Sequence, residues 1–233
     1  MKDKINICYV INDHPDYIKL TLESIEFIKK FFRSKKHILS FYIISEESIN
    51  LPDDIINIIS PYKNIPLLWQ RMYIPELLNV DKVIFLDSDT VTKTCISKLW
   101  NIDIGNKLLG LSPHYCTFSI QEMLDHYNLN NFSLYNEKKN LKQYYNCGVA
   151  IINCKLWRSI KAEKICLKYY NQIKSTPHWM NDEPTYNVCF SDLIFEIDDK
   201  WNHFPRGDYK RVYITHYYGT YNKDKPYHNE FAI

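Results

Sequence analysis

The stretch Lys82-Val83-Ile84-Phe85-Leu86-Asp87-Ser88-Asp89 decides how the rest of the chain is interpreted. Its apolar part is rich in branched and aromatic residues, which is typical of a buried strand. Two carboxylates follow at once, separated by one small residue. Because side chains two apart in an extended backbone point the same way, Asp87 and Asp89 project to one side, about 7 Å apart along the strand. One divalent cation can lie between them.

The same Asp-Ser-Asp tripeptide also has a simpler interpretation. After a strand, such a sequence often forms a polar turn or the N-cap of a following helix. In open α/β sheets, however, ligands collect at the carboxyl ends of strands, where a bound cation would meet a phosphorylated substrate. The tripeptide alone leaves both interpretations open.

Composition indicates one globular domain over residues 1–233. The chain is 45% hydrophobic and 15% aromatic, and 29 basic against 27 acidic residues give a net charge of +2. This balance argues against a nucleic-acid partner. The 7 cysteines are scattered without a Cys-x-x-Cys pair, as in reduced intracellular proteins. We expect a soluble, cytoplasmic protein without a signal peptide or membrane span, and the tyrosine-rich composition allows a homodimer.

Alternating periodicities predict an α/β fold, in which strand-helix-strand repeats imply right-handed crossovers on a parallel sheet. Gly148 stands where a side chain would obstruct a close approach to the extended core segment. A polar surface loop is expected over 136–143. Strands are predicted over 5–11, 39–44, 82–86, 108–112, 144–153, 195–197 and 213–219, with a further extended piece beginning at 65. Helices are predicted over 16–32, 52–59, 67–78 with a bend at Pro75, 95–100, 118–131, 155–174 and 182–190.

The strand predicted at 213–219 delivers His216 into a loop, in the sequence Tyr213-Ile214-Thr215-His216-Tyr217-Tyr218-Gly219. A histidine at a strand end is structural more often than it is a metal ligand. Its position alone therefore leaves its role open.

Four motifs follow one another along the chain. They are Asp81–Thr90 with Leu99-Trp100; Tyr145–Val149 through Asn153 with Trp157-Arg158; Asp182-Glu183-Pro184 with Asn187; and His216-Tyr217-Tyr218-Gly219 with Lys225-Pro226. In this order they resemble the family 8 glycosyltransferases, the retaining GT-A enzymes that include glycogenins and bacterial lipopolysaccharide galactosyltransferases. The likeness implies a GT-A nucleotide-diphospho-sugar transferase fold, in which a Rossmann-like mixed central sheet is flanked by helices.

The resemblance implies a metal site and a donor site. By it, Asp87, Asp89 and His216 are expected to ligate Mn²⁺, with Mg²⁺ as the alternative, and the diphosphate of a UDP-sugar fills the remaining positions. Carboxylate and imidazole ligands suit Mn²⁺, which offsets the charge on a leaving nucleoside diphosphate. Further donor-binding residues implied by the family are Val10, Asn12, Asp13 and His14 at the uridine, and Ser88, Gly219 and Lys225 at the phosphates.

The family also places Arg71, Asn146, Asp182 and Glu183 around the sugar and the reacting bond. Glu183 departs from better-known members, which have glutamine there. A carboxylate could stabilise an oxocarbenium-like state or attack it, although an acid at a helix start is also a structural residue. The other departures are Asn12 in place of an acid, a longer loop between His216 and Lys225, Tyr227 in place of tryptophan, and the short stretch after Pro226, which predicts that the C-terminal tail of some relatives is missing.

The resemblance implies a retaining, Mn²⁺-dependent transfer of a hexose, glucose or galactose, from UDP-glucose or UDP-galactose to a hydroxyl acceptor. The acceptor is a glycan, a lipid-linked group or a protein. A glycogenin-like primer that glucosylates one of its own 19 tyrosines, or a non-catalytic scaffold that binds UDP-sugar, remains open. A sugar-1-phosphate nucleotidyltransferase is less favoured because no glycine-rich phosphate loop lies near the N-terminus.

Overall fold

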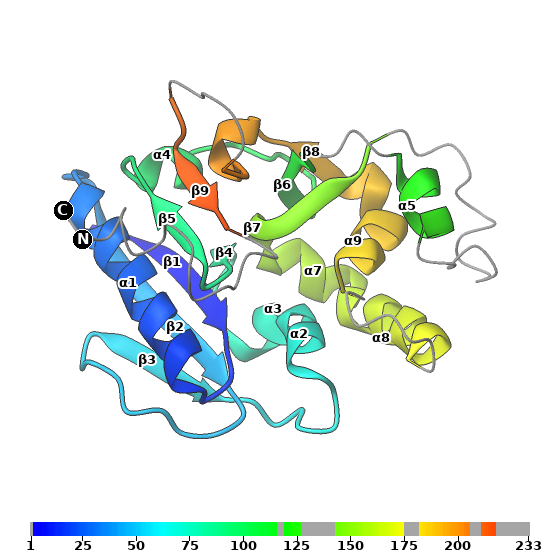
Figure 1. Ribbon diagram of the computed structural model, residues 1–233, viewed down its shortest axis with the longest axis horizontal. Coiled ribbons are helices and arrows are strands. Elements are labelled where there is room, and N and C mark those ends of the chain that lie inside the picture. Colours follow the sequence, from blue (N-terminus) through cyan, green and yellow to red (C-terminus); the bar gives the residue numbers. More distant parts are fainter. Residues whose placement is uncertain (1, 116–118, 127–142, 175–181, 206–210, 218–233) are drawn as a thin grey trace.

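A seven-stranded sheet lies at the centre of the fold (Figure 1). The computed structural model describes residues 2–115, 119–126, 143–174, 182–205 and 211–217. Its strand order is β3-β2-β1-β4-β7-β6-β8. β7 runs antiparallel to both neighbours and all other pairs are parallel, so the sheet is mixed, as the family resemblance implied. The strands are β1 (Asp3–Val10), β2 (His37–Ser45), β3 (Ile55–Ile59), β4 (Lys82–Leu86), β6 (Leu109–Pro113), β7 (Tyr145–Asn153) and β8 (Ile194–Glu196).

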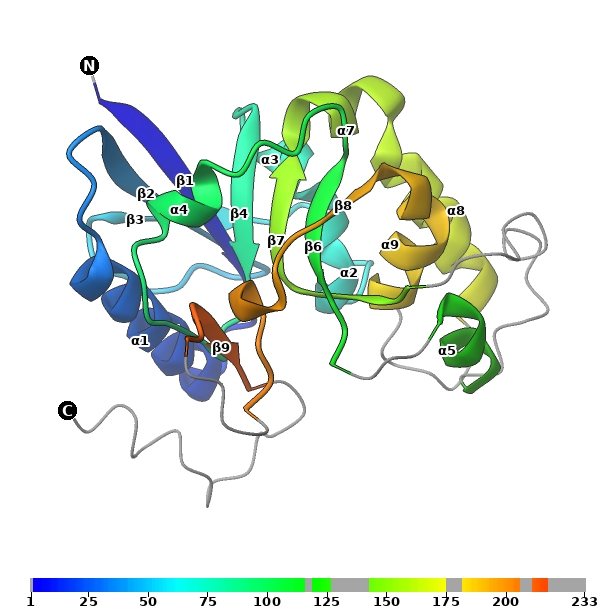
Figure 2. The same ribbon diagram turned by 90° about the horizontal axis from the view of Figure 1, so that it is seen from above.

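Helices cover both faces of this sheet (Figure 2). Consecutive residues of β4 therefore enter different cores. Val83 and Phe85 pack with α7 (Cys154–Ile160), α8 (Ala162–Ile173) and α9 (Asp182–Phe190). Ile84 and Leu86 pack with α1 (Pro15–Phe31) and α4 (Ser97–Trp100). A strand buried on both faces has the continuous apolar sequence seen here. The other described helices are α2 (Leu67–Gln70), α3 (Ile74–Leu77) and α5 (Ile120–His126). Short 3-10 turns lie at Arg71–Tyr73, Ser191–Leu193 and Asp199–Trp201.

Helix α1 begins and ends where its sequence dictates. His14 caps the N-terminus by accepting a hydrogen bond from the Asp16 backbone N–H, and Pro15 occupies the first turn. Lys29 and Lys30 lie in the last turn, where positive charge stabilises the helix dipole. A turn of four residues, 11–14, separates the end of β1 at Val10 from the start of α1 at Pro15.

The segment 52–59, predicted to be helical, instead forms strand β3 over Ile55–Ile59. Its branched isoleucines favour a strand, and Asn57 links it to β2 by donating to the carbonyl of Ile43 and to Ser45 Oγ. The extended piece expected from Ile65 is also wrong, because α2 begins at Leu67.

Two predicted helices are interrupted. The first, 67–78, divides into α2, a 3-10 turn and α3, with Pro75 in the first turn of α3. The second, 155–174, breaks at Lys161, whose φ of 55° is left-handed. The predicted loop 136–143 lies outside the described residues except for Gln143, and parts of 118–131 and 213–219 also lie outside them.

A small second sheet pairs β5 (Thr90–Thr92) with β9 (Ile214–His216), antiparallel, in the register that sets Thr90 opposite His216 (Figure 1). β5 follows β4 after a three-residue turn, so the tail histidine lies beside the Asp-Ser-Asp turn. Within the described part of the chain, no helix has the length and apolar character that crossing a membrane requires.

Candidate active site

Three metal-ligating side chains meet at the carboxyl end of β4. Asp87 and Asp89 come from the turn after the strand, and His216 comes from β9. His216 Nε2 lies 3.1 Å from Asp89 Oδ1 and 3.4 Å from Asp87 Oδ2. The ligand atoms of the three residues all lie within 4.8 Å of one another. Two carboxylates and one imidazole facing a common point form a donor set that fits Mn²⁺ or Mg²⁺.

Gly148 makes this convergence possible. A Cβ at this position would overlap Cε1 of His216 and would lie 2.6 Å from Asp87 Oδ2. The Gly148 carbonyl accepts a hydrogen bond of 2.8 Å from the Asp87 backbone N–H, so β7 cannot retreat without breaking its pairing with β4. The glycine expected to allow a close approach therefore makes room for the imidazole ring.

Arg71 joins the metal-ligating cluster to the residues expected at the sugar. Its Nη1 lies 3.6 Å from Asp87 Oδ1, and its Nε donates to Asp182 Oδ2. The guanidinium also lies 5.2 Å above the Phe85 ring, and only 10% of the side chain is exposed. A buried arginine between two carboxylates has partners for its charge and is held in one orientation.

The charges within the cluster shift the pKa values of its members. Burial alone would raise the pKa of Asp87, but the hydrogen bond with His216 and the charge of Arg71 outweigh burial and hold it below its usual value. Burial disfavours the charged form of His216, yet Asp89 and Asp87 raise its pKa to about 9. At neutral pH a cation must therefore displace a proton from the imidazole before binding to it.

Glu183 and Asn146 form a second group of polar side chains close to this cluster. Glu183 Oε2 accepts hydrogen bonds from Asn146 Nδ2 at 2.8 Å and from the Cys147 backbone N–H at 3.1 Å. Burial raises the pKa of Glu183 to about 7, although the Cys147 hydrogen bond and Arg71 oppose the increase. Asp182, which starts α9, is 4% exposed and accepts from the Glu183 backbone N–H.

The expected uridine-binding residues leave β1 at the same edge of the sheet. β1 is the parallel neighbour of β4, so Val10 and the turn after it lie on the same side as Asp87. Asn12 Oδ1 accepts from the His14 backbone N–H, and His14 caps α1. Asp13 and His14 are exposed. These contacts are those of a turn and a helix start, and binding of the base remains a prediction.

Of the three residues expected at the phosphates, only Ser88 belongs to the part of the chain that the structure describes. Ser88 is half-buried between the two aspartates. Gly219 and Lys225 lie outside the described residues, so their positions remain predictions.

Sequence reasoning missed Asn202. This side chain is 5% exposed and follows the 3-10 turn Asp199–Trp201. Its Oδ1 lies 2.8 Å from His216 Nδ1, and its Nδ2 donates to Asn146 Oδ1 at 2.7 Å. No spacing or periodicity marks an asparagine that acts through contacts 14 and 56 residues away.

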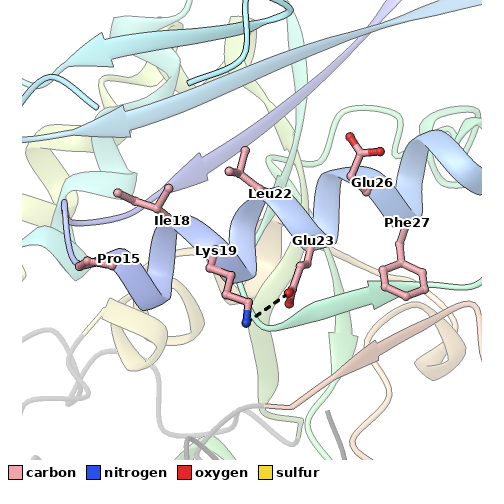
Figure 3. Close-up of a pocket in the computed structure, with 7 residues that line it drawn as sticks. All are labelled: Pro15, Ile18, Lys19, Leu22, Glu23, Glu26 and Phe27. Atoms are coloured by element: carbon pink, nitrogen blue, oxygen red, sulfur yellow. Dashed lines mark ion pairs between the residues drawn. The ribbon is translucent and has the colours of Figure 1, made fainter. Parts of the chain in front are cut away.

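A hollow along α1 lies apart from this cluster (Figure 3). Its charged side chains largely balance one another: Lys19 pairs with Glu23 at 3.9 Å, and Glu26 pairs with Lys29 at 2.9 Å. The lining comes wholly from α1: Pro15, Ile18, Lys19, Leu22, Glu23, Glu26 and Phe27. The converging ligand atoms therefore identify the sheet edge at β4, not this hollow, as the candidate active site.

Solved structures of sugar transferases resemble this fold. Galactosyltransferase LgtC, in complex with donor and acceptor sugar analogues, superposes with a TM-score of 0.69 at 17% identity, over 94% of this chain and 90% of that one. GlyE of Streptococcus pneumoniae TIGR4 gives 0.68 at 17% identity, over 97% and 56% of the two chains. Mouse xyloside xylosyltransferase 1 gives 0.64 at 12% identity, over 91% and 97%.

The fold is the GT-A fold of these transferases, and it brings the Asp-Asp-His cluster together at the end of β4. The sequence model of the family described as Glycosyl transferase family 8 matches residues 9–231, so the chain belongs to that family.

Curated plant proteins are similar over part of their length. Probable galacturonosyltransferase-like 6 of Arabidopsis thaliana is 30% identical over 148 residues, which cover 61% of this chain and 42% of the relative. Probable galacturonosyltransferase-like 9 is 29% identical over 165 residues, covering 66% and 42%. The matches thus span about two fifths of the length of these relatives.

Proposed function

We propose that this chain, as one domain over residues 1–233, transfers a glucosyl or galactosyl group from a UDP-hexose to a hydroxyl acceptor with retention of configuration. The single observation that carries the proposal is the convergence of Asp87, Asp89 and His216 at the end of β4, in space that only a glycine at 148 leaves open. Mn²⁺, with Mg²⁺ as the alternative, is the ion these ligands would hold.

The ion would supply positive charge that offsets the charge developing on the leaving diphosphate. The protein residues have separate roles in the proposal. Asp87, Asp89 and His216 hold the ion, and Ser88, Gly219 and Lys225 contact the phosphates. The turn formed by Val10, Asn12, Asp13 and His14 holds the uridine, because the carboxyl edge of a parallel sheet is where nucleotides bind.

The sugar would lie beside Arg71, Asn146, Asp182 and Glu183. Arg71 is already fixed by Asp182, so it can present its remaining N–H groups in a constant direction. In its ionised form, the Glu183 carboxylate would stabilise positive charge on the anomeric carbon. With retention, the leaving phosphate oxygen takes the acceptor proton on the same face of the sugar. The acceptor is a hydroxyl group of a glycan, a lipid-linked group or a protein.

The charges around these residues favour a neutral donor sugar. The plant relatives are named galacturonosyltransferase-like, and galacturonic acid carries a carboxylate. Among the described residues, Arg71 is the cation beside the expected sugar position, and it already forms ion pairs with Asp182 and Asp87. Glu183 adds a further carboxyl group. A uronate would therefore meet unbalanced negative charge, which like-charge repulsion makes costly.

Donor turnover tests the proposal. Release of UDP would be measured with Mn²⁺ and each of UDP-glucose, UDP-galactose and UDP-galacturonic acid. We expect a neutral donor to exceed the uronate donor by at least about 10-fold in kcat/KM. A preference for UDP-galacturonic acid would contradict the donor assignment.

Two variants separate the metal site from general effects. Asp89→Ala should abolish Mn²⁺-dependent turnover. Asp81→Ala, at the opposite end of β4 with a side chain that is 82% exposed, should leave it unchanged. Intact-mass spectrometry after incubation with UDP-glucose and Mn²⁺ distinguishes the reaction types: added hexose masses indicate self-glucosylation, and retained UDP binding without turnover indicates a scaffold.

A further inference from the structure

A chain of hydrogen bonds determines which way the amide groups around His216 are oriented. The chain starts at the backbone N–H of Gly148, which can only donate. It reaches Asn146 at 3.0 Å, so the atom that receives it must be the amide oxygen Oδ1. The Nδ2 group of Asn146 then donates to Glu183 Oε2 at 2.8 Å, consistent with the same orientation. The orientation of Asn146 is therefore fixed by its neighbours.

The orientation of Asn146 in turn fixes that of Asn202. Asn146 Oδ1 accepts from the Asn202 amide at 2.7 Å, and the Asn146 carbonyl accepts from it at 3.3 Å. Two acceptors on one side require the NH₂ group of Asn202 there. Its oxygen must then face His216, where Oδ1 lies 2.8 Å from Nδ1.

An amide oxygen can only accept, so Nδ1 of His216 must carry a hydrogen. When the ring is neutral, the lone pair is then on Nε2, which is the atom that lies 3.1 Å and 3.4 Å from the carboxylates of Asp89 and Asp87. The opposite tautomer would place two lone pairs against each other at Nδ1 and would direct an N–H at the cation position.

The backbone holds Asn202 firmly enough for this role. The 3-10 turn before it is anchored by Trp201, which is 4% exposed. The residue after it, His203, is bonded to β9 on both sides: its N–H donates to the Ile214 carbonyl, and its carbonyl accepts from the His216 N–H at 2.8 Å. Asn202 and the His216 ring are thus held in one frame.

We propose that Asn202 is a positioning residue that selects the metal-binding tautomer of His216. The inference rests on the metal site of the proposed function. Groups that fix the tautomer of a ligating histidine typically contribute 10- to 100-fold to metal affinity. Asn202 would do so without touching the ion or the sugar, and it links the metal ligand to Asn146 in the sugar-side group.

Mn²⁺ binding without any donor sugar tests this inference. Affinity would be measured by electron paramagnetic resonance of free Mn²⁺ for the wild type, Asn202→Ala and Asn202→Asp. We expect Asn202→Ala to bind about 10- to 100-fold more weakly. Asn202→Asp keeps an acceptor for the Nδ1 hydrogen but loses the donation to Asn146, so it should bind Mn²⁺ more tightly than Asn202→Ala, because a carboxylate partner preserves the ligand tautomer.

Asn57→Ala is the matched control. Asn57 also makes three hydrogen bonds, to Ile49, Ile43 and Ser45, but it joins β2 to β3. Its loss should lower the unfolding temperature without changing Mn²⁺ affinity. In protein loaded with diamagnetic Zn²⁺, ¹⁵N spectra should show Nδ1 of His216 protonated and Nε2 bound to the metal.

The outcomes separate the two proposals. Equal Mn²⁺ affinity for wild type and Asn202→Ala would overturn the role of Asn202 alone, as would an Asn202→Asp variant as weak as Asn202→Ala. Zn²⁺ bound at Nδ1 would overturn it as well. A wild-type protein that does not bind Mn²⁺ saturably would overturn the metal site itself, and the inference with it.

Discussion

Replacing Gly148 with alanine would place a methyl group where the metal-ligating imidazole lies. The new Cβ would overlap Cε1 of His216 and stand 2.6 Å from Asp87 Oδ2. Ordinary contacts begin near 3.5 Å, so the Asp87 oxygen must move by about 1 Å and the imidazole ring by more. The ring is held by Asn202 and by β9, and Asp87 is held by Arg71. A displacement of this size at a catalytic group typically costs about 100-fold in rate.

We therefore expect Gly148→Ala to lose about 100-fold in Mn²⁺-dependent UDP release, with a loss of about 1–3 kcal/mol in the free energy of unfolding from overpacking. Gly110→Ala in β6 is the matched control. Its Cβ would meet Ile104 and Ile151 at 3.1 and 3.2 Å, so it strains the same sheet without touching the ligands. Both variants should unfold at lower temperature, but only Gly148→Ala should lose Mn²⁺ affinity. Wild-type Mn²⁺ affinity in Gly148→Ala would refute the geometry.

Three further predictions concern charge. Because metal and proton compete for His216, whose metal-free pKa is raised to about 9, Mn²⁺ affinity in titration calorimetry should rise with pH from 6 to 9; a flat profile would show that the imidazole is not a ligand. Arg71→Met should leave Asp182 buried and unpaired and cost about 3–5 kcal/mol in urea unfolding, whereas exposed Arg33→Met should cost little. Burial and the neighbouring Glu163 raise the pKa of Glu76 to about 7, so ionisation of this side chain destabilises the fold as pH rises from 4.5 to 7. Glu76→Gln should therefore raise the unfolding temperature at pH 8 but not at pH 4. Equal effects at the two pH values would contradict this.

The central strand and its two aspartates could be predicted from sequence because both signals are local. A run buried on two faces is apolar throughout, and β4 is such a strand. The helix predicted over 52–59 is wrong because Pro52-Asp53-Asp54 resembles a helix start. The hydrogen bonds that make Ile55–Ile59 a strand come from β2, which the local sequence does not reveal. The break at Lys161 could not be predicted, because the residue with positive φ is a lysine and not the glycine that usually marks such a position.

The site was predictable only as far as its motifs reach. Asp87, Asp89 and His216 converge as the family resemblance implied, although the last two lie 127 positions apart in the sequence. The role of Asn202 depends on the orientation of two amides, which is set by a backbone N–H in β7. Such contacts exist only once the sheet has formed, so no local pattern encodes them. Metal and donor binding by these residues stay predictions.

Anomalous diffraction from crystals soaked in Mn²⁺ and UDP tests the central claim most directly. The account predicts one strong manganese peak at the end of β4, about 2.2 Å from carboxylate oxygens of Asp87 and Asp89 and from Nε2 of His216. Manganese at another place, or an imidazole turned away from the ion, would contradict it.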